Sequence, residues 1–424
     1  MILAALILAM LVLLFIRVPV AISMLLPCLV YFVWSPFTLG TALQQSMSPI
    51  DSFPLLAVPL FIMTGYLSNV GGLADRLFRM LLCLFGRIPG SLGYVNVISS
   101  LLFSWMSGAA IADAAGLGSV LVPAMKKRGY DEGFALGLTG ASSLIGPIMP
   151  PSIPAIVYAV TAGVSVGSLF FAGVLPALVL TAILCAFVFA DARRNPLRDE
   201  AAAPRIPLKT AVLAALPVLL TPVIILGGIL GGVFTPTEAA AAAVMWVLFL
   251  GICYRSLSFR DFHGVLVKTA STTGSIMLIV AAAGLFGWVI ALEQGPQAVT
   301  EAMLRLTDNR YVFLLLINVA LLVTGMLLEP VAGLLITVPV LLPAATAFGI
   351  DPLQLGIVMI LNLVLGLLTP PVGLVLYVLS SVTGATVQQV IRGTVPFLIP
   401  LLITLLLITF FPAFSLWLPN LLAN

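Results

Sequence analysis

The sequence predicts an all-α polytopic membrane protein made of two inverted repeats, each with a re-entrant helical hairpin and a broken transmembrane helix. Three observations support this fold class. Of the 424 residues, 62% are hydrophobic and 8% are charged, whereas soluble domains carry about 25% charged residues. A double proline follows a glycine inside an apolar segment twice, at Pro150-Pro151 and Pro370-Pro371. The two segments that hold these prolines also align with each other without a gap.

The double prolines predict helices that break inside the membrane. Proline lacks a backbone N–H, clashes with the preceding helical turn and pushes the residue before it out of the helical region. A break inside lipid leaves backbone groups that cost several kcal/mol each unless protein, ion or water satisfies them. Matched breaks in two halves of a chain indicate the binding site of a transporter.

The N-terminal unit, residues 1–70, is expected to hold scaffold spans. Apolar runs predict a first span over 1–16, a turn at Arg17 and a second span that ends at Trp34. Residues 35–52 are mixed and interrupted by proline, so they are expected to lie along the membrane interface. A third span is predicted over about 53–69.

The first repeat is predicted over residues 71–163. It opens with an amphipathic arm helix between Asn69 and Gly90, which is basic on one side. A hairpin over 91–123 follows, with a polar tip from Ser107 to Asp113, and then a broken helix over 132–163.

Length and charge favour a hairpin over a crossing at 91–123. Gly108 lies 14 residues after Tyr94, a rise of about 21 Å in a helix, which is short of the ~30 Å hydrocarbon core. Basic residues flank the hairpin on both sides: Arg76, Arg79 and Arg87 before it and Lys126, Lys127 and Arg128 after it. A hairpin leaves both groups in the cytoplasm, as the positive-inside rule requires.

The rest of the chain is predicted as scaffold, second repeat and C-terminal span. Residues 164–264 hold spans at 168–190, 209–231 and 237–254, with a cytoplasmic loop at 192–208. The second repeat, 265–379, holds a span at 265–292, an arm helix at 293–310, a hairpin at 311–343 with its tip from Gly325 to Ala332, and a broken helix at 353–379. A last span, 393–418, lies in the unit 380–424. Both termini are then expected in the periplasm, because sixteen of the 18 Lys and Arg fall inside.

The repeat itself is read from 31 aligned residues. Leu121–Pro151 align with Leu341–Pro371, and the identities fall at residues that determine backbone geometry: Pro123/Pro343, Gly129/Gly349, Asp131/Asp351, Gly146/Gly366, Pro150/Pro370 and Pro151/Pro371. The first hairpin enters from the basic face and the second from the opposite face. The two repeats are therefore expected to be antiparallel.

Oxygen atoms at the tips and breaks are candidate ligands for a hard monovalent cation. The predicted sodium-binding residues are Ser104, Ser107, Gly108, Ser143 and Gly146 in the first repeat and Thr324, Gly325, Asn362, Gly366 and Thr369 in the second. The predicted substrate-binding residues are Ser107, Pro150, Pro151, Pro370 and Pro371. The alternative for the hydroxyls is that they only bond back to their own helices.

Two acids, Asp113 and Glu329, are expected at membrane depth. Acids there are costly and are usually functional. They are candidates for tuning cation affinity, for carrying a proton or for meeting a partner at the tip. The alternative role is capping of a helix at the hairpin tip.

Several other functions have no supporting pattern. There is no GxxxxGK[ST] motif for nucleotide hydrolysis, and one histidine and four scattered cysteines do not form a transition-metal motif. An intramembrane enzyme would need a metal motif or nucleophile elbow, which the sequence lacks. A channel is disfavoured because matched inverted hairpins indicate two alternating gates.

Five stretches together resemble the large membrane subunit of the TRAP (tripartite ATP-independent periplasmic) transporters. They are Val58-Pro59-Leu60-Phe61, Ser107-Gly108 to Asp113, Gly146-Pro147-Ile148-Met149-Pro150-Pro151-Ser152-Ile153-Pro154, Phe234-Thr235-Pro236-Thr237-Glu238-Ala239-Ala240 and Gly366-Leu367-Leu368-Thr369-Pro370-Pro371-Val372-Gly373. The resemblance runs from end to end. The chain departs from the usual family pattern at Ala109, where a serine is common, and at Glu329, where an aspartate is common.

This resemblance implies a multi-pass protein of the bacterial inner membrane that imports organic acids, such as C4-dicarboxylates or sialic-acid-like sugar acids, by an elevator mechanism. It implies coupling to sodium ions, at least two of them, and no nucleotide. The implied partners are a small four-helix membrane subunit and a periplasmic substrate-binding protein. The alternative is a stand-alone anion/sodium symporter of related fold that works without a binding protein.

Overall fold

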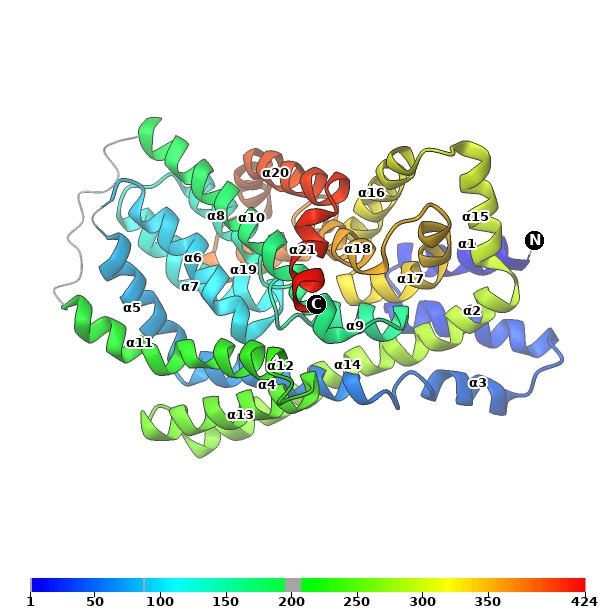
Figure 1. Cartoon of the computed structure of the whole chain (residues 1–424), viewed down its shortest axis with the longest axis horizontal. Helices are drawn as coiled ribbons and strands as arrows, with labels where there is room; N and C mark the ends of the chain where they lie inside the picture. The colour runs from blue at the N-terminus through cyan, green and yellow to red at the C-terminus, as the bar shows by residue number, and fades with distance from the viewer. Residues whose placement is uncertain (1, 87, 195–206, 424) are drawn as a thin grey trace.

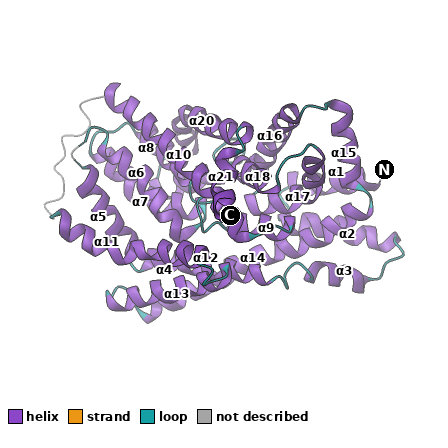
Figure 2. Ribbon diagram, in the orientation of Figure 1, coloured by secondary structure: helices purple, strands orange, loops and turns teal. Residues whose placement is uncertain are grey.

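The computed structural model describes residues 2–86, 88–194 and 207–423, and every regular element within these ranges is a helix (Figure 2). Within these ranges, eight helical stretches are long and apolar enough to cross a membrane. The predicted fold class, an all-α membrane protein, is confirmed. Arg87 and most of the loop predicted at 192–208 lie outside the described residues.

The N-terminal elements follow the predicted order. They are α1 (Ile2–Phe15), α2 (Val20–Trp34), α3 (Leu39–Met47), a short 3₁₀ turn (Phe53–Leu56) and α4 (Ala57–Val70). The helix α14 (Phe259–Leu292) packs along α2, α3 and α4, and α13 (Pro236–Cys253) packs on α4 (Figure 1). A stretch of α11 (Leu208–Pro222), a π-helical turn and α12 (Gly228–Leu230) precedes α13.

The predicted arm and first hairpin are α5 (Leu73–Phe85), α6 (Ser91–Ser107) and α7 (Ala110–Lys127). The arm is amphipathic, and its buried residues share one face: Leu73, Leu77, Met80 and Leu81. Helix α6 ends at Gly108, whose φ of +60° lies in the left-handed region that glycine adopts readily. The turn between α6 and α7 thus lies at Gly108 and Ala109.

The first broken helix consists of α8 (Glu132–Ser143) and α9 (Ile153–Ala162). The Asp131 carboxylate caps α8 by accepting the backbone N–H of Phe134 at 2.9 Å. The Ser152 hydroxyl caps α9 by accepting the N–H of Ala155 at 3.1 Å. Between the two halves lies an irregular segment that contains the cis Pro150-Pro151 bond.

The second repeat has the same parts in the same order: α15 (Gly295–Leu306), α16 (Arg310–Leu327), α17 (Pro330–Ala347), α18 (Pro352–Gly366) and α19 (Leu374–Thr383). Asp351 caps α18 as Asp131 caps α8. Pro370-Pro371 is cis like Pro150-Pro151, and Gly349 has a positive φ like Gly129. The alignment of the two halves therefore matches equivalent positions in the structure.

The two repeats exchange the second halves of their broken helices. Helix α9 packs along α17 of the second hairpin, and α19 packs along α7 of the first. The first halves pack on the hairpins of their own repeats: α8 packs on α6 and α7, and α18 packs on α16 and α17. Each broken helix therefore passes from its own hairpin to the hairpin of the other repeat, as expected if the two hairpins enter from opposite faces.

Two long helices, which the sequence groups with the scaffold and with the C-terminal unit, pack against the repeats. Helix α10 (Val166–Arg194) was expected in the scaffold, but its main contacts are with α6, α9, α18, α20 and α21. Helix α20 (Val387–Phe410) begins before the predicted span 393–418 and packs most extensively on α8. The span also stops early, because Phe411 precedes Pro412 and is extended; α21 (Ala413–Ala423) follows as a separate helix.

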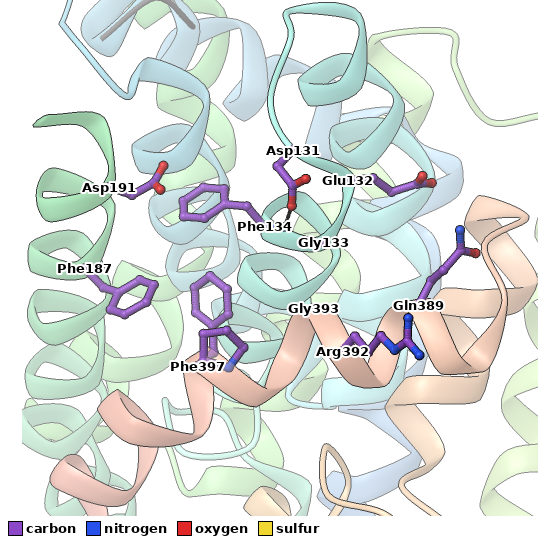
Figure 3. Close-up of a pocket in the computed structure, with 11 residues that line it drawn as sticks. Asp131, Glu132, Gly133, Phe134, Phe187, Asp191, Gln389, Arg392, Gly393 and Phe397 are labelled. Atoms are coloured by element: carbon purple, nitrogen blue, oxygen red, sulfur yellow. Dashed lines mark hydrogen bonds between the residues drawn. The ribbon is translucent and has the colours of Figure 1, made fainter. Parts of the chain in front are cut away.

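The contact of α8 with α20 is glycine-based (Figure 3). A Cβ atom on Gly137 would lie 2.0 Å from the carbonyl oxygen of Gly393, so no side chain fits there. Beside this contact the Phe397 ring lies 5.6 Å from Phe134 and 4.8 Å from Phe187, measured between centroids. These rings line a cavity of about 460 Å³ at the end of α10. Helix α20 is therefore an integral part of the repeat core.

We predict that Gly137→Ala destabilises the protein, whereas Gly264→Ala does not. The new methyl group at residue 137 would separate α8 from α20 and cost about 1–3 kcal/mol. A Cβ on Gly264, in α14, meets no atom within 4 Å. Thermal unfolding in detergent measures both changes, and equal midpoints for the two variants would contradict the packing described here.

Candidate functional site

The candidate site lies where each hairpin tip meets the break in the helix of its own repeat. We call residues 107–113 with 144–152 the first junction, and residues 324–329 with 362–373 the second junction. In the first, a Cβ on Gly108 would lie 2.4 Å from the carbonyl oxygen of Pro151. In the second, a Cβ on Gly366 would lie 2.1 Å from the carbonyl carbon of Gly325. Both contacts are backbone against backbone.

Asp113 is the charged group of the first junction. It is completely buried, and one carboxylate oxygen accepts a hydrogen bond from the Ser107 hydroxyl. The other oxygen has no hydrogen-bond partner among the described residues, and it faces Gly146, where a Cβ would lie 2.4 Å away. The N-cap position of α7 is Ala109, so helix capping does not explain Asp113. A buried carboxylate without a counter-charge calls for a cation or a proton beside it.

Four other hydroxyls among the predicted sodium ligands bond back to their own helices, as the alternative interpretation held. The Ser104 and Ser143 hydroxyls donate to the carbonyls of Leu101 and Gly140 at 2.6 and 2.8 Å. Thr324 and Thr369 likewise donate to the carbonyls of Ala320 and Leu365, both at 2.9 Å. These bonds use the hydroxyl hydrogens and leave oxygen lone pairs for a cation.

The second junction is built on amides. Asn362 is fully buried, and its Nδ2 donates to Asn318 Oδ1 at 2.8 Å and to the Val358 carbonyl at 2.7 Å. Its Oδ1 has no partner among the described residues. Glu329 is half-buried at the N-cap position of α17, where the helix N-terminus favours a negative charge. One junction therefore buries a carboxylate and the other buries an unpaired amide oxygen.

Several polar side chains that tie each hairpin to its broken helix were not predicted from the sequence. In the first repeat Asn96 Nδ2 donates to Thr139 Oγ1 at 2.7 Å, and Ser142 accepts from Ser100 at 2.9 Å. In the second, Asn318 Nδ2 also donates to Thr409 Oγ1 of α20 at 3.0 Å. An asparagine inside an apolar hairpin arm was the available signal, because such a residue needs a partner in the membrane.

The double prolines lie in different surroundings. Pro150 and Pro151 are buried, Pro370 is half-buried and Pro371 is exposed. The structure thus brings Ser107 and the first pair together at the first junction and leaves the second pair at an open edge. Among the described residues no three His, Cys, Asp or Glu side chains gather where they would hold a metal ion.

Comparison with known families gives one match over nearly the whole chain. Residues 7–414 match the family model described as tripartite ATP-independent periplasmic transporter, DctM component. All of the elements that form the two junctions fall inside this range.

Curated relatives agree with this match. The chain is 44% identical to the sialic acid TRAP transporter large permease protein SiaM of Vibrio cholerae, over 96% of each chain. It is 38% identical to the C4-dicarboxylate TRAP transporter large permease protein DctM of Pseudomonas aeruginosa, over 92% of each. It is also 38% identical to the sialic acid TRAP transporter permease protein SiaT of Haemophilus influenzae, over 97% of this chain and 67% of that one.

Among solved structures, the YdaH transporter of Alcanivorax borkumensis resembles this chain in fold. Its crystal structure, titled as revealing an unusual topology, superposes with a TM-score of 0.63 over 91% of each chain at 16% sequence identity. At that identity the similarity concerns the fold alone.

We predict that Asn318→Leu loosens the second hairpin far more than Thr324→Val. The leucine removes the acceptor for Asn362 and the donor for Thr409, and a buried polar atom left without a partner costs about 1–3 kcal/mol. The Thr324 hydroxyl bonds only within its own helix. Amide hydrogen exchange of α16 and α18 measures the loosening. Equal exchange in both variants would contradict the role given to the Asn318 hydrogen bonds.

Proposed function

Because the chain belongs to the tripartite ATP-independent periplasmic transporter family as its DctM component, we propose that it is the large permease of a sodium-coupled importer of organic acid anions. The observation that carries this proposal is the buried Asp113 carboxylate, with one unpaired oxygen beside a broken helix. It offers a cation a negative charge and nearby carbonyl and hydroxyl oxygens.

Sodium suits both junctions for one chemical reason. Hard cations prefer oxygen ligands, and each junction offers carbonyl and side-chain oxygens from a hairpin tip and a helix break. One ion at Asp113 and Ser107, and a second at the Asn362 oxygen beside Gly325 and Gly366, would each meet a buried oxygen that has no hydrogen-bond partner among the described residues. We therefore assign at least two sodium ions.

Sodium coupling supplies enough free energy for import without ATP. Each positive charge that crosses at 100 mV contributes ~2.3 kcal/mol, and a tenfold concentration ratio adds ~1.4 kcal/mol per ion. Two ions that carry one monoanion give ~5 kcal/mol net, which is equivalent to accumulation of roughly a thousandfold or more.

The substrate is assigned as a carboxylate, since relatives are named for sialic acid and C4-dicarboxylates. Neither junction contains a Lys or Arg in its sequence. An anionic substrate would then be held by Ser107, by helix ends and by the bound cations. Recognition is delegated to a periplasmic binding protein, and a small four-helix subunit completes the membrane part.

An elevator movement fits the way the repeats are joined. The hairpins, the broken helices, α10 and α20 are interlocked by the helix exchange and by the buried Asn and Thr hydrogen bonds. We propose that this unit moves as one body against α1–α4, α11, α13 and α14, with both termini in the periplasm.

Reconstitution tests the proposal as a whole. Proteoliposomes that contain this chain and its small subunit should accumulate sialic acid or a C4-dicarboxylate only with an inward sodium gradient and the matching binding protein. Uptake at the same rate with and without a sodium gradient would refute sodium coupling. Uptake that needs sodium but no binding protein would instead favour the alternative, a stand-alone anion/sodium symporter.

We predict that Asp113→Asn weakens sodium activation of uptake. Loss of the negative charge should raise the half-saturating sodium concentration about tenfold or more, a change of ~1.4 kcal/mol. Asp308→Asn is the matched control, because Asp308 is exposed and lies before the start of α16, at the end of that helix away from the second junction. If the two variants and the unchanged protein share one sodium curve, Asp113 has no part in coupling.

A further inference from the structure

A basic cavity of about 300 Å³ lies between the arm helix α5 and the start of α11. Arg76, Arg79 and Asp75 line it from α5, and Thr210 and Ala214 line it from α11. Helix α11 opens the candidate span Leu208–Leu230, so its first turns lie at the boundary between water and lipid. In Figure 1 the two helices lie side by side at one end of the molecule.

The two arginines are held in place and available to a ligand. The guanidinium of Arg76 stacks over the Tyr254 ring, 3.5 Å from its centroid, which fixes the group, and the side chain is half-buried. Arg79 is exposed. Neither arginine makes an ion pair with a described residue. With one carboxylate, that of Asp75, on the same wall, the cavity carries a net positive charge.

We propose that this cavity binds the headgroup of an anionic phospholipid. Guanidinium groups match phosphate oxygens in geometry and charge, and basic pockets on the cytoplasmic side of membrane proteins bind anionic headgroups. The basic residues clustered at this end place it in the cytoplasm. Leu213, next to Ala214, is 58% exposed and offers an apolar surface to the acyl chains, which a soluble anion would not need.

A lipid bound here would connect three elements. The headgroup joins α5 to α11, and the Arg76–Tyr254 stack extends the link to the end of α13. Helix α5 also packs on α6, the first arm of the first hairpin. The bound lipid thus braces the arm where the repeat core meets the neighbouring spans.

Lipid titration of the purified full-length chain in detergent tests this site. Phosphatidylglycerol should raise the thermal midpoint in a saturable way, and phosphatidylcholine should not. Each arginine near the membrane surface contributes about fivefold to the affinity, so Arg76→Gln with Arg79→Gln should weaken the effect about 25-fold. Arg260→Gln, an exposed position outside the cavity, should respond like the unchanged protein.

A cavity-filling variant keeps the test independent of folding defects in the arginine variant. Ala214→Phe leaves both arginines in place and should abolish the saturable response while the midpoint in phosphatidylcholine stays the same. The proposal is overturned if phosphatidylglycerol stabilises the double arginine variant with unchanged affinity. It is also overturned if glycerol 3-phosphate alone reproduces the shift, since the ligand would then be a soluble anion.

Discussion

The close approach of each hairpin tip to a helix break is the contact on which the rest of the structure depends. A broken helix inside a membrane leaves backbone groups that lipid cannot satisfy. Here the backbone of Gly108 faces Pro151, and the backbone of Gly325 faces Gly366, at distances that exclude a Cβ atom. The tips therefore cover the breaks, and the oxygen-rich surface that results is also the candidate ion site.

Hydrogen bonds behind the tips explain why hairpin and broken helix stay together. Asn96 and Asn318 each lie within the first arm of a hairpin and bond to the facing half-helix. The exchange of α9 and α19 then joins the two hairpins to each other. Because α20 supplies Thr409 to the same network, it belongs to this unit and not to the surrounding spans.

Much of this architecture could be predicted from the sequence, because glycine, proline and charge mark backbone breaks and membrane sides. Gly108 and the Pro150-Pro151 pair lie at interruptions of the helices, where the sequence predicts a hairpin tip and a helix break. The packing of α10 and α20 could not be predicted, since such helices are apolar on every face and no stripe identifies a partner. The unpaired oxygen of Asp113 could not be predicted either, because Gly146, which it faces, lies more than 30 residues away in sequence.

The exchange of half-helices has a consequence for biosynthesis. Helix α9 ends at Ala162, but its partner α17 begins only at Pro330. At ~5–20 residues per second, a ribosome needs on the order of ten to thirty seconds to make the intervening chain. During that interval α9 lacks its partner α17 and can pack only against earlier elements and α10, so part of its surface stays exposed to lipid. Neither repeat can reach its final packing until translation of both is nearly finished.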